Sequence, residues 1–331
     1  MPQLNATSDS QRVAVIIVNW NGGSLLRQCL EHLSRQTLAP SQIIVFDNAS
    51  SDDSAVGALE FDRVQLIRSE QNLGFAAGNN RALHHCDCEL VALLNADAFA
   101  DPNWLQCLVQ AATDRPDAAA FSSLQLNHDD PSIADGFGDA YHLSGLARRI
   151  GFGVPVASLR NRGYFDRHRD VFSACAAAAL YRREALRQVG GFDEDYFCYF
   201  EDIDLSFRLR LAGHAVVAVP QAIVRHMGSA SSGGYESDFS VYYGHRNMVW
   251  VFVKNMPKSL LLVLLPLHLL ANILILLRFT FQGRASVILR AKYDAVLGLR
   301  GAWRKRRHIQ SNRVVGAVGI WRLLSKRWTD D

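Results

Sequence analysis

Cysteine is scarce in this sequence and does not occur in a metal-binding or disulfide pattern. Six cysteines are spread over 331 residues, and none has zinc-type spacing to a second Cys or His pair. Isolated cysteines in apolar segments usually pack as small hydrophobic side chains, so we expect free thiols and a reducing cytoplasm. The first twelve residues contain no apolar core, which predicts that no secretory signal is present. These absences argue against a disulfide-stapled secreted domain and against a structural zinc module.

Acidic residues are nearly missing from the last part of the chain. Residues 278–331 contain 13 Lys and Arg but only 3 Asp and Glu, although the whole chain has a net charge of only +3. A basic tail on a mildly acidic body predicts contact with an anionic surface, either lipid headgroups or nucleic acid. Aromatic side chains for base stacking are sparse in the tail, and Trp303, Trp321 and Trp328 stand among Arg and Lys, as is typical of a membrane interface. We therefore expect an anionic membrane surface as a partner, and no nucleic acid.

Long apolar runs are absent except in one segment. The 19 residues from Ser259 to Leu277 carry no formal charge, and Lys258 and Arg278 flank them. About 20 apolar residues can span a bilayer, so a single crossing is one interpretation. The alternative is a helix that packs on the core of the protein itself.

Short β-branched apolar runs alternate with helical periodicity in the first part of the chain. We expect strands at residues 13–18, 43–46, 64–67, 90–94 and, later, 215–219. We expect helices at residues 74–85, 103–113 and 201–212, with a further helix starting at 184. Strands that alternate with helices predict an α/β fold with a mostly parallel, doubly wound central sheet.

Polar residues follow three of the predicted strands. These clusters are Asn19-Trp20-Asn21, Asp47-Asn48 and Asn95-Ala96-Asp97. Ligands of parallel α/β sheets bind outside the carboxyl ends of the strands, so the clusters predict a site at one edge of the sheet. Residues 127–170 are polar and rich in Gly and Arg, which predicts a long loop over this site.

Three carboxylates and a histidine favour acid–base and metal chemistry. Asp202 stands with Glu201 at a predicted helix start, after aromatic residues that can raise a carboxylate pKa, and it is well placed to take a proton from a hydroxyl. The alternative is that both acids only satisfy free amides and the helix dipole. Asp97 can meet a hard divalent cation that bridges phosphates, and His226 can complete its coordination. A turn-forming Asp and a structural His are the alternatives.

Six segments together resemble the family 2 glycosyltransferases of GT-A fold, in particular their bacterial rhamnosyltransferase-like branch. In family order over about residues 13–255, the segments are 15–22 (VIIVNWNG), 47–52 (DNASSD), 72–80 (NLGFAAGNN), 93–98 (LLNADA), 190–213 (GGFDEDYFCYFEDIDLSFRLRLAG) and 242–247 (YYGHRN). The resemblance implies a GT-A, nucleotide-sugar-binding catalytic domain at residues 13–257. A polar segment, 1–12, precedes it, and a membrane-associating apolar helix with a basic helical tail, 258–331, follows it.

The resemblance also implies roles for individual residues. Asp202 corresponds to the catalytic base, and Glu201 supports it or binds acceptor hydroxyls. Asp97 corresponds to the last acid of the metal-binding Asp-x-Asp motif, and His226 stands where many GT-A enzymes have a third metal ligand. Asn95 replaces the first acid of that motif, so the metal depends more on Asp97, His226 and the diphosphate. The residues expected to bind the donor are Asn19, Asn21, Asp47, Asn48, Gly74, Asn79, Asn95 and Asp97, with Asp47 as the nucleotide-base contact. The residues expected to bind the acceptor are Asp193, Tyr199, Glu201 and Arg208.

The implied activity is inverting, metal-dependent sugar transfer from a dTDP- or UDP-sugar, with Mg²⁺ or Mn²⁺. The resemblance favours L-rhamnose from dTDP-rhamnose, moved to a polyprenyl-diphosphate-linked saccharide or a surface polysaccharide. One alternative is a nucleotidyltransferase that makes a nucleotide sugar, but residues 19–23 lack the basic side chain that its phosphate loop needs. The other is a non-catalytic, membrane-bound sugar-binding protein, which has no need of Asp97, Asp202 and His226.

The same resemblance decides how we interpret the apolar helix. Nucleotide sugars are cytoplasmic, and basic flanks prefer that side, so the catalytic domain and the basic tail belong on one face. His268 and Asn272 give the helix a slightly polar stripe, and Pro266 can bend it. We therefore predict a peripheral or monotopic protein at the cytoplasmic face of the inner (plasma) membrane, with a helix that lies in the interface or dips in and returns.

Overall fold

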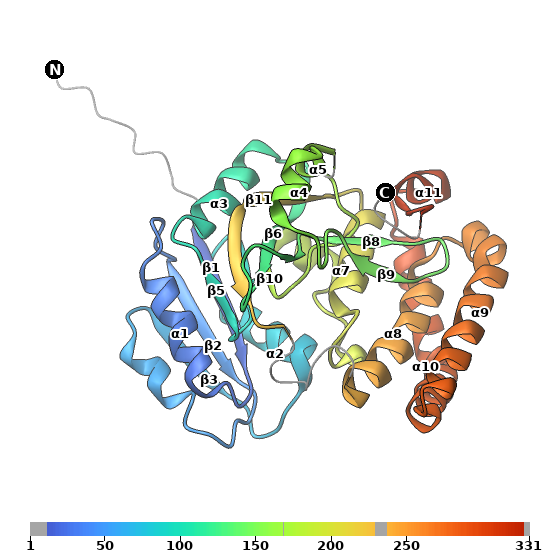
Figure 1. Ribbon diagram of the computed structural model, residues 1–331, viewed down its shortest axis with the longest axis horizontal. Helices are drawn as coiled ribbons and strands as arrows, with labels where there is room; N and C mark the ends of the chain where they lie inside the picture. Colours follow the sequence, from blue (N-terminus) through green and yellow to red (C-terminus); the bar gives the residue numbers. More distant parts are fainter. Residues whose placement is uncertain (1–11, 168, 229–236, 328–331) are drawn as a thin grey trace.

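The computed structural model describes residues 12–167, 169–228 and 237–327, and within these it forms one central sheet with helices on both faces and a helical bundle at one end (Figure 1). The predicted segment 1–12 and the tryptophan at 328 lie almost entirely outside the described residues. The strands are β1 (Val13–Asn19), β2 (Gln42–Asp47), β3 (Val64–Arg68), β4 (Leu90–Leu94), β5 (Ala98–Ala100), β6 (Ala118–Asn127), β7 (Ala134–Gly136), β8 (Asp139–Tyr141), β9 (Ala147–Arg149), β10 (Ala178–Arg182) and β11 (Ala215–His226).

The central sheet has the strand order β3-β2-β1-β4-β10-β6-β11-β5, with β7 paired to β6. The first four strands in this order are parallel, as predicted, and the α/β class is confirmed. Beyond them the sheet is mixed, because β10 runs antiparallel to both β4 and β6. Because β10 is antiparallel, its first residue, Ala178, lies beside Leu94 at the end of β4. The residues just before β10 therefore lie at the same edge of the sheet as the ends of β1, β2 and β4.

Helices cover both faces of the sheet. The helical elements are α1 (Gly23–Ser34), η1 (Val56–Glu60), α2 (Gly74–Leu83), α3 (Trp104–Asp114), α4 (Val156–Asn161), α5 (Tyr164–Arg167), α6 (Arg183–Val189), η2 (Glu194–Tyr196), α7 (Glu201–Leu211), α8 (Asp238–Asn255), α9 (Lys258–Phe281), α10 (Ala285–Ser311) and α11 (Ala317–Leu323). Alternate residues of β1 pack on opposite sides: Ile17 contacts the core under α1 and α3, and Ile16 contacts the core under α2, α6 and α7. Burial on both faces explains why the strand is continuously apolar.

The prediction of one long loop at residues 127–170 is wrong. This segment contains β7, the antiparallel hairpin β8–β9 and the short helices α4 and α5. Each element is three to six residues long, too short for a period of two or 3.6 to be recognisable. Strand β6 precedes it, and its alanine-rich start carries little β-propensity of its own.

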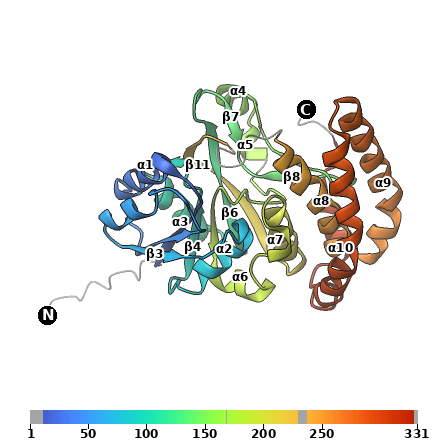
Figure 2. The same ribbon diagram turned by 90° about the horizontal axis from the view of Figure 1, so that it is seen from below.

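The C-terminal helices form a bundle beside α7 (Figure 2). Helix α10 packs along α8, and the Trp250 indole N–H donates to the Ala295 carbonyl at 2.8 Å. A separate apolar core, which includes Phe207, Phe252 and Leu264, joins α7, α8, α9 and α11. The predicted apolar helix is therefore real, and its bounds agree with the sequence pattern, whereas the division of the chain at residue 257 stays a prediction.

Candidate active site

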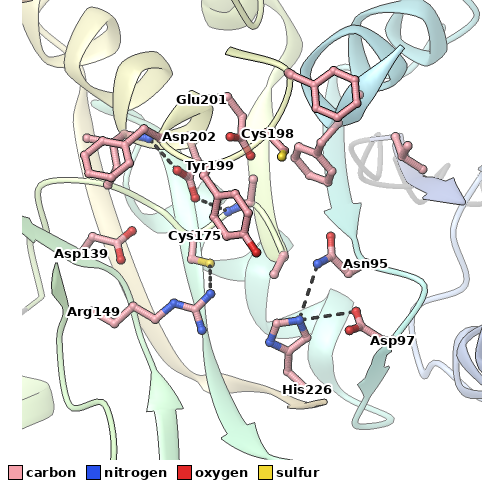
Figure 3. A pocket seen from close by; sticks show the side chains of 18 of the residues that line it. Asn95, Asp97, Asp139, Arg149, Cys175, Cys198, Tyr199, Glu201, Asp202 and His226 are labelled. Atoms are coloured by element: carbon pink, nitrogen blue, oxygen red, sulfur yellow. Dashed lines mark hydrogen bonds and ion pairs between the residues drawn. The ribbon is translucent and has the colours of Figure 1, made fainter. Parts of the chain in front are cut away.

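A pocket of about 1090 Å³ lies at the carboxyl ends of β1, β2 and β4, the edge that the polar clusters predicted (Figure 3). Loops after these strands form one side of it, and the hairpin β8–β9, the start of β10 and the residues before α7 form the other. Of the predicted site residues, those that line the pocket are Asn48, Gly74, Asn95, Asp97, Tyr199, Glu201, Asp202 and His226. Aromatic side chains, including Trp20, Phe152 and Phe239, form much of the remaining wall.

The ends of β1 and β2 are joined by a polar network that is buried at Asn19 and Asp47 and exposed at Asn21 and Ser51. Parallel pairing sets Asn19 directly beside Asp47, and the Asn19 amide donates to the Asp47 carboxylate at 3.3 Å. The same amide donates to Ser50 and Ser54, and the Asn21 side chain accepts from the Ser51 backbone N–H at 2.7 Å. These contacts fix the loops after both strands, so the residues form a frame for this edge of the sheet.

Asp97, Asn95 and His226 gather at one side of the pocket (Figure 3). The His226 Nε2 atom lies 3.5 Å from the Asp97 carboxylate and 3.5 Å from the Asn95 amide nitrogen. Its Nδ1 atom lies 2.9 Å from the carboxylate of Asp135, which cannot donate, so we assign the ring proton to Nδ1. In the neutral imidazole, Nε2 therefore has a lone pair on the Asp97 side of the pocket, whereas in the protonated ring the same atom faces Asp97 with a proton.

The donor set at this place fits a divalent cation that also binds a diphosphate. Among the described residues, no three His, Cys, Asp or Glu side chains converge as a complete metal site. Mg²⁺ and similar ions, however, are commonly held by one or two protein ligands and the phosphates of the substrate. Asp97 and His226 would supply two such ligands at the pocket wall, and Asp135 lies 2.9 Å from the other imidazole nitrogen, where outer-shell carboxylates of metal proteins are found. Burial lowers the pKa of His226 but hydrogen bonds to Asp135 and Asp97 raise it more, so the net shift is upward.

Glu201 and Asp202 start α7 on the opposite side of the pocket. The Asp202 carboxylate accepts from the Ile203 N–H at 2.8 Å and from the Ala176 N–H at 3.3 Å, which holds it at the pocket wall. Burial raises the pKa of Asp202, and the two backbone N–H groups and Arg149 offset part of that rise. Glu201 is 7% exposed, and its Oε2 atom has no hydrogen-bond partner among the described residues. Burial, followed by the charge of Asp202, raises the Glu201 pKa well above its usual range.

The hairpin β8–β9 contributes pocket residues that the sequence analysis did not identify. Asp139 is buried, and burial together with the charge of Asp202 raises its pKa to about 8. Arg149 donates to Asp135 at 2.6 Å and to the Cys175 sulfur at 3.2 Å, so Asp135 joins it to His226. These residues lie in the segment predicted as a loop and in no recognised motif, and only the fold brings them to the site.

Several predicted site residues do not line the pocket. The Asn79 amide donates to the Phe75 carbonyl one turn earlier in α2. Asn19 and Asp47 contact each other in the network that joins the ends of β1 and β2. Asp193 contacts Lys254 and Lys305, each at 2.5 Å, on the far side of the residues that precede α7. The guanidinium of Arg208 is buried against Asp204 and the carbonyls of Val189 and Gly191. Acceptor binding by Asp193 and Arg208 therefore stays a prediction. In the structure both side chains form ion pairs within the protein.

The chain belongs to the glycosyltransferases of family 2. The sequence profile described as "Glycosyl transferase family 2" matches residues 14–190, more than half of the chain. Within the family the chain is similar to bacterial rhamnosyltransferases. It is 29% identical over 264 residues to the N-acetylglucosaminyl-diphospho-decaprenol L-rhamnosyltransferase of Mycobacterium tuberculosis, covering 72% of this chain and 83% of that one. It is 27% identical to the O-antigen chain rhamnosyltransferase RfbN of Salmonella typhimurium, covering 65% of this chain and 66% of that one.

Solved structures support the GT-A fold. A mannosyltransferase from Pyrobaculum calidifontis, in complex with GDP-Man and Mn²⁺, superposes with a TM-score of 0.53 at 18% identity, covering 94% of this chain and 88% of that one. The GalNAc-T7 structure with UDP, GalNAc and Mn²⁺ superposes with a TM-score of 0.59 at 17% identity, covering 76% of this chain and 49% of that one. At these identities the likeness concerns the fold alone.

Proposed function

We propose that this glycosyltransferase moves L-rhamnose from dTDP-rhamnose to a lipid-linked saccharide or surface polysaccharide, with inversion at the anomeric carbon. The observation that carries the proposal is the pocket itself, in which Asp97 and His226 face Glu201 and Asp202 across a space large enough for a nucleotide sugar. The choice of sugar rests on the rhamnosyltransferases among the relatives.

The mechanism that fits this geometry is a single in-line displacement. Asp202 accepts the proton of the acceptor hydroxyl, whose oxygen forms a bond to the anomeric carbon while the bond to the diphosphate breaks. The raised Asp202 pKa strengthens this carboxylate as a base. Asp97 and His226 would hold a divalent cation, which when bound supplies charge stabilisation to the departing nucleoside diphosphate. The apolar and aromatic wall excludes water from the reacting atoms, so transfer is favoured over hydrolysis.

A donor panel tests the proposed substrate. Purified protein is incubated with dTDP-rhamnose, UDP-GlcNAc, UDP-galactose or GDP-mannose and a polyprenyl-diphosphate-linked saccharide, and release of nucleoside diphosphate is measured. We expect acceptor-dependent release with dTDP-rhamnose, at least tenfold above the other donors, because a site built for one sugar's hydroxyl groups rejects others by leaving its polar groups unpaired. Faster turnover of another donor would overturn the choice of rhamnose.

The surface of the helical bundle supports membrane association. Among the described residues, α9 is the one helix long and apolar enough to span a bilayer, and only 22% of its most apolar stretch is buried. Its predicted polar stripe faces the protein: His268 stacks on Phe252 and lies 2.7 Å from the Ser144 carbonyl, and Asn272 lies 2.6 Å from Lys292 of α10. Helix α10 then returns along α8. From α9 to the end of the described residues, the large exposed apolar side chains are Leu262, Val263, Leu265, Leu269, Leu270, Ile273, Leu274, Leu277, Phe281, Leu289, Tyr293, Val296, Leu297, Trp303, Val314, Val318 and Trp321.

We propose that this face lies on the cytoplasmic leaflet as a monotopic anchor. A spanning helix would have to leave its contacts with Phe252 and Ser144, and the hairpin α9–α10 keeps the basic tail beside the catalytic domain. Exposed arginines of α10, including Arg300, Arg304 and Arg307, suit anionic headgroups at the edge of the apolar face. The anchor would bring the pocket to a lipid-linked acceptor.

Vesicle flotation tests the anchor. The wild-type protein should float with vesicles that contain anionic lipid, and the double variant Leu269→Glu/Ile273→Glu should lose at least tenfold in partitioning, because both side chains are 53% exposed on α9. Val56→Glu/Leu59→Glu is the matched control, since these equally exposed apolar residues lie on η1. Equal loss in both double variants would contradict the assigned face.

Topology is tested in intact cells with a membrane-impermeant maleimide. We expect protection of both Ser51→Cys in the catalytic domain and Ser311→Cys at the end of α10. Labelling of Ser311→Cys with protection of Ser51→Cys would show that α9 spans the membrane.

A further inference from the structure

The residues between η2 and α7 hold an unusual backbone at the pocket wall. Phe197, Tyr199 and Phe200 all have positive φ, at 65°, 62° and 67°. Bulky residues rarely adopt this region, so such a conformation persists only where surrounding contacts impose it. Figure 3 shows the Tyr199 ring reaching into the pocket beside Glu201 and Asp202, which follow directly in the chain. The backbone at 197–200 therefore determines where both proposed catalytic carboxylates lie.

Asn247, on α8, is the main contact that imposes this conformation. Its side-chain NH₂ group lies 3.0, 2.8 and 2.7 Å from the carbonyl oxygens of Tyr196, Cys198 and Tyr199. The side chain is fully buried, and its own oxygen accepts from Arg246 at 2.9 Å. Carbonyl oxygens can only accept, so the orientation of the amide is fixed: the nitrogen must face the loop. The two N–H bonds of this amide are shared among three carbonyls, of which that of Tyr196 also accepts from the Cys198 N–H at 2.8 Å.

Arg246 and the start of α2 also hold this loop. Arg246 donates to the carbonyls of Asp195 and Tyr196 at 3.0 and 3.1 Å, and its guanidinium stacks over the Trp250 ring. From the opposite side, the Ala76 N–H at the start of α2 donates to the Phe197 carbonyl at 3.1 Å. Gly74 permits this approach, because a Cβ at that position would lie 2.6 Å from the same oxygen. The loop is held between the donor side of the fold and α8.

We propose that Asn247 is a positioning residue for sugar transfer, which holds Tyr199, Glu201 and Asp202 in the geometry that the reaction requires. The inference rests on the proposed function and assigns a role to the motif at residues 242–247, which the mechanism otherwise leaves unused. Asn247 is not among the residues that line the pocket, so it would act through the backbone of the loop.

The test compares Asn247→Ala with Asn255→Ala. Both asparagines are fully buried on α8, and the Asn255 amide donates to Asp204 at 2.7 Å, away from the pocket. We expect both variants to lower the unfolding temperature, and only Asn247→Ala to lower kcat, by roughly 10²-fold, because misplacing catalytic groups by about 1 Å has an effect of that size. The affinity for the nucleoside diphosphate should stay within about twofold of wild type. Asn247→Asp, which matches the shape but cannot donate, should behave like Asn247→Ala.

A second measurement does not depend on turnover. Hydrogen exchange of the backbone amides at 197–201, a stretch that excludes the Asn255 partner Asp204, should become faster in Asn247→Ala and not in Asn255→Ala. Unchanged exchange in that segment, faster exchange with unchanged kcat, or full activity of Asn247→Asp would each overturn the inference. Wild-type protein without turnover on any nucleotide sugar would overturn the proposed function, whereas the exchange comparison would still decide whether Asn247 holds the loop.

Discussion

Replacement of Asp202 by asparagine is expected to reduce the rate of sugar transfer by about 10²–10⁴-fold, the usual loss when a general base is removed. The substitution keeps the size of the side chain and the acceptor oxygen that faces the Ile203 N–H, so the start of α7 should stay folded. Because the base acts on the acceptor hydroxyl, affinity for the nucleotide sugar should remain near that of wild type. Transfer kinetics and calorimetric titration of the donor measure the two quantities separately.

The pH profile gives an independent check on the same residue. A base works in its ionised form, so kcat/KM should fall as the pH drops through the Asp202 pKa. Burial raises that pKa, so the acid limb should lie at a higher pH than for an exposed aspartate. The residual activity of Asp202→Asn should lack this limb.

The matched control for Asp202 is Asp193→Asn, which removes a carboxylate from the same stretch of chain. Asp193 is paired with Lys254 and Lys305, so this variant should lose stability more than kcat. Near-normal turnover of Asp202→Asn would refute the assignment, and Glu201, the neighbouring carboxylate at the pocket wall, would then be the candidate base.

Removal of the divalent cation is expected to abolish donor binding and transfer. Excess EDTA should stop the reaction, and Mg²⁺ or Mn²⁺ should restore it, with Mn²⁺ favoured because one ligand is an imidazole. Asp97→Ala and His226→Ala should each weaken cation-dependent donor binding by at least tenfold, since Asn95 carries no charge that could compensate. Calorimetric titration of the donor with and without Mn²⁺ measures the effect.

Asp139→Asn serves as the control for the cation experiment. Its carboxyl lines the same pocket, but its pKa of about 8 keeps it mostly protonated at neutral pH, so the substitution changes little charge. Cation-dependent donor binding should persist in this variant. Full activity of the wild-type protein in excess chelator would contradict the proposed role of Asp97 and His226.

The position of Asn48, Asn95 and Asp97 at the pocket could be predicted from the sequence because these residues closely follow strongly apolar strands. Asn48, Asn95 and Asp97 stand at strand ends, and parallel strands bring such ends to one edge of a sheet. The carboxylates that start α7 could be predicted for a similar reason, since the helix has a clear beginning at Glu201. In these places one local pattern determines the position of the side chain.

The remaining parts of the site depend on contacts between distant segments. Arg149 reaches the pocket on a hairpin of three-residue strands, and Asp135 reaches His226 only because β7 pairs with β6. Asp193 stands in a motif from which substrate binding is expected. In the fold, however, its carboxylate pairs with Lys254 and Lys305, which are 61 and 112 residues away in the chain. The contacts of Asn247 could not be predicted from the sequence either. They depend on the positive φ values of Phe197, Tyr199 and Phe200, which turn the carbonyls of this loop toward α8.

The product of the reaction tests the central claim most directly. Purified protein is given the preferred nucleotide sugar and its acceptor, the nucleotide released is identified by chromatography, and the anomeric configuration of the new linkage is determined by NMR. The proposed mechanism predicts one nucleoside diphosphate for each sugar transferred and a configuration opposite to that of the donor. A product that keeps the configuration of the donor, or pyrophosphate formed from a nucleoside triphosphate and a sugar phosphate, would contradict it.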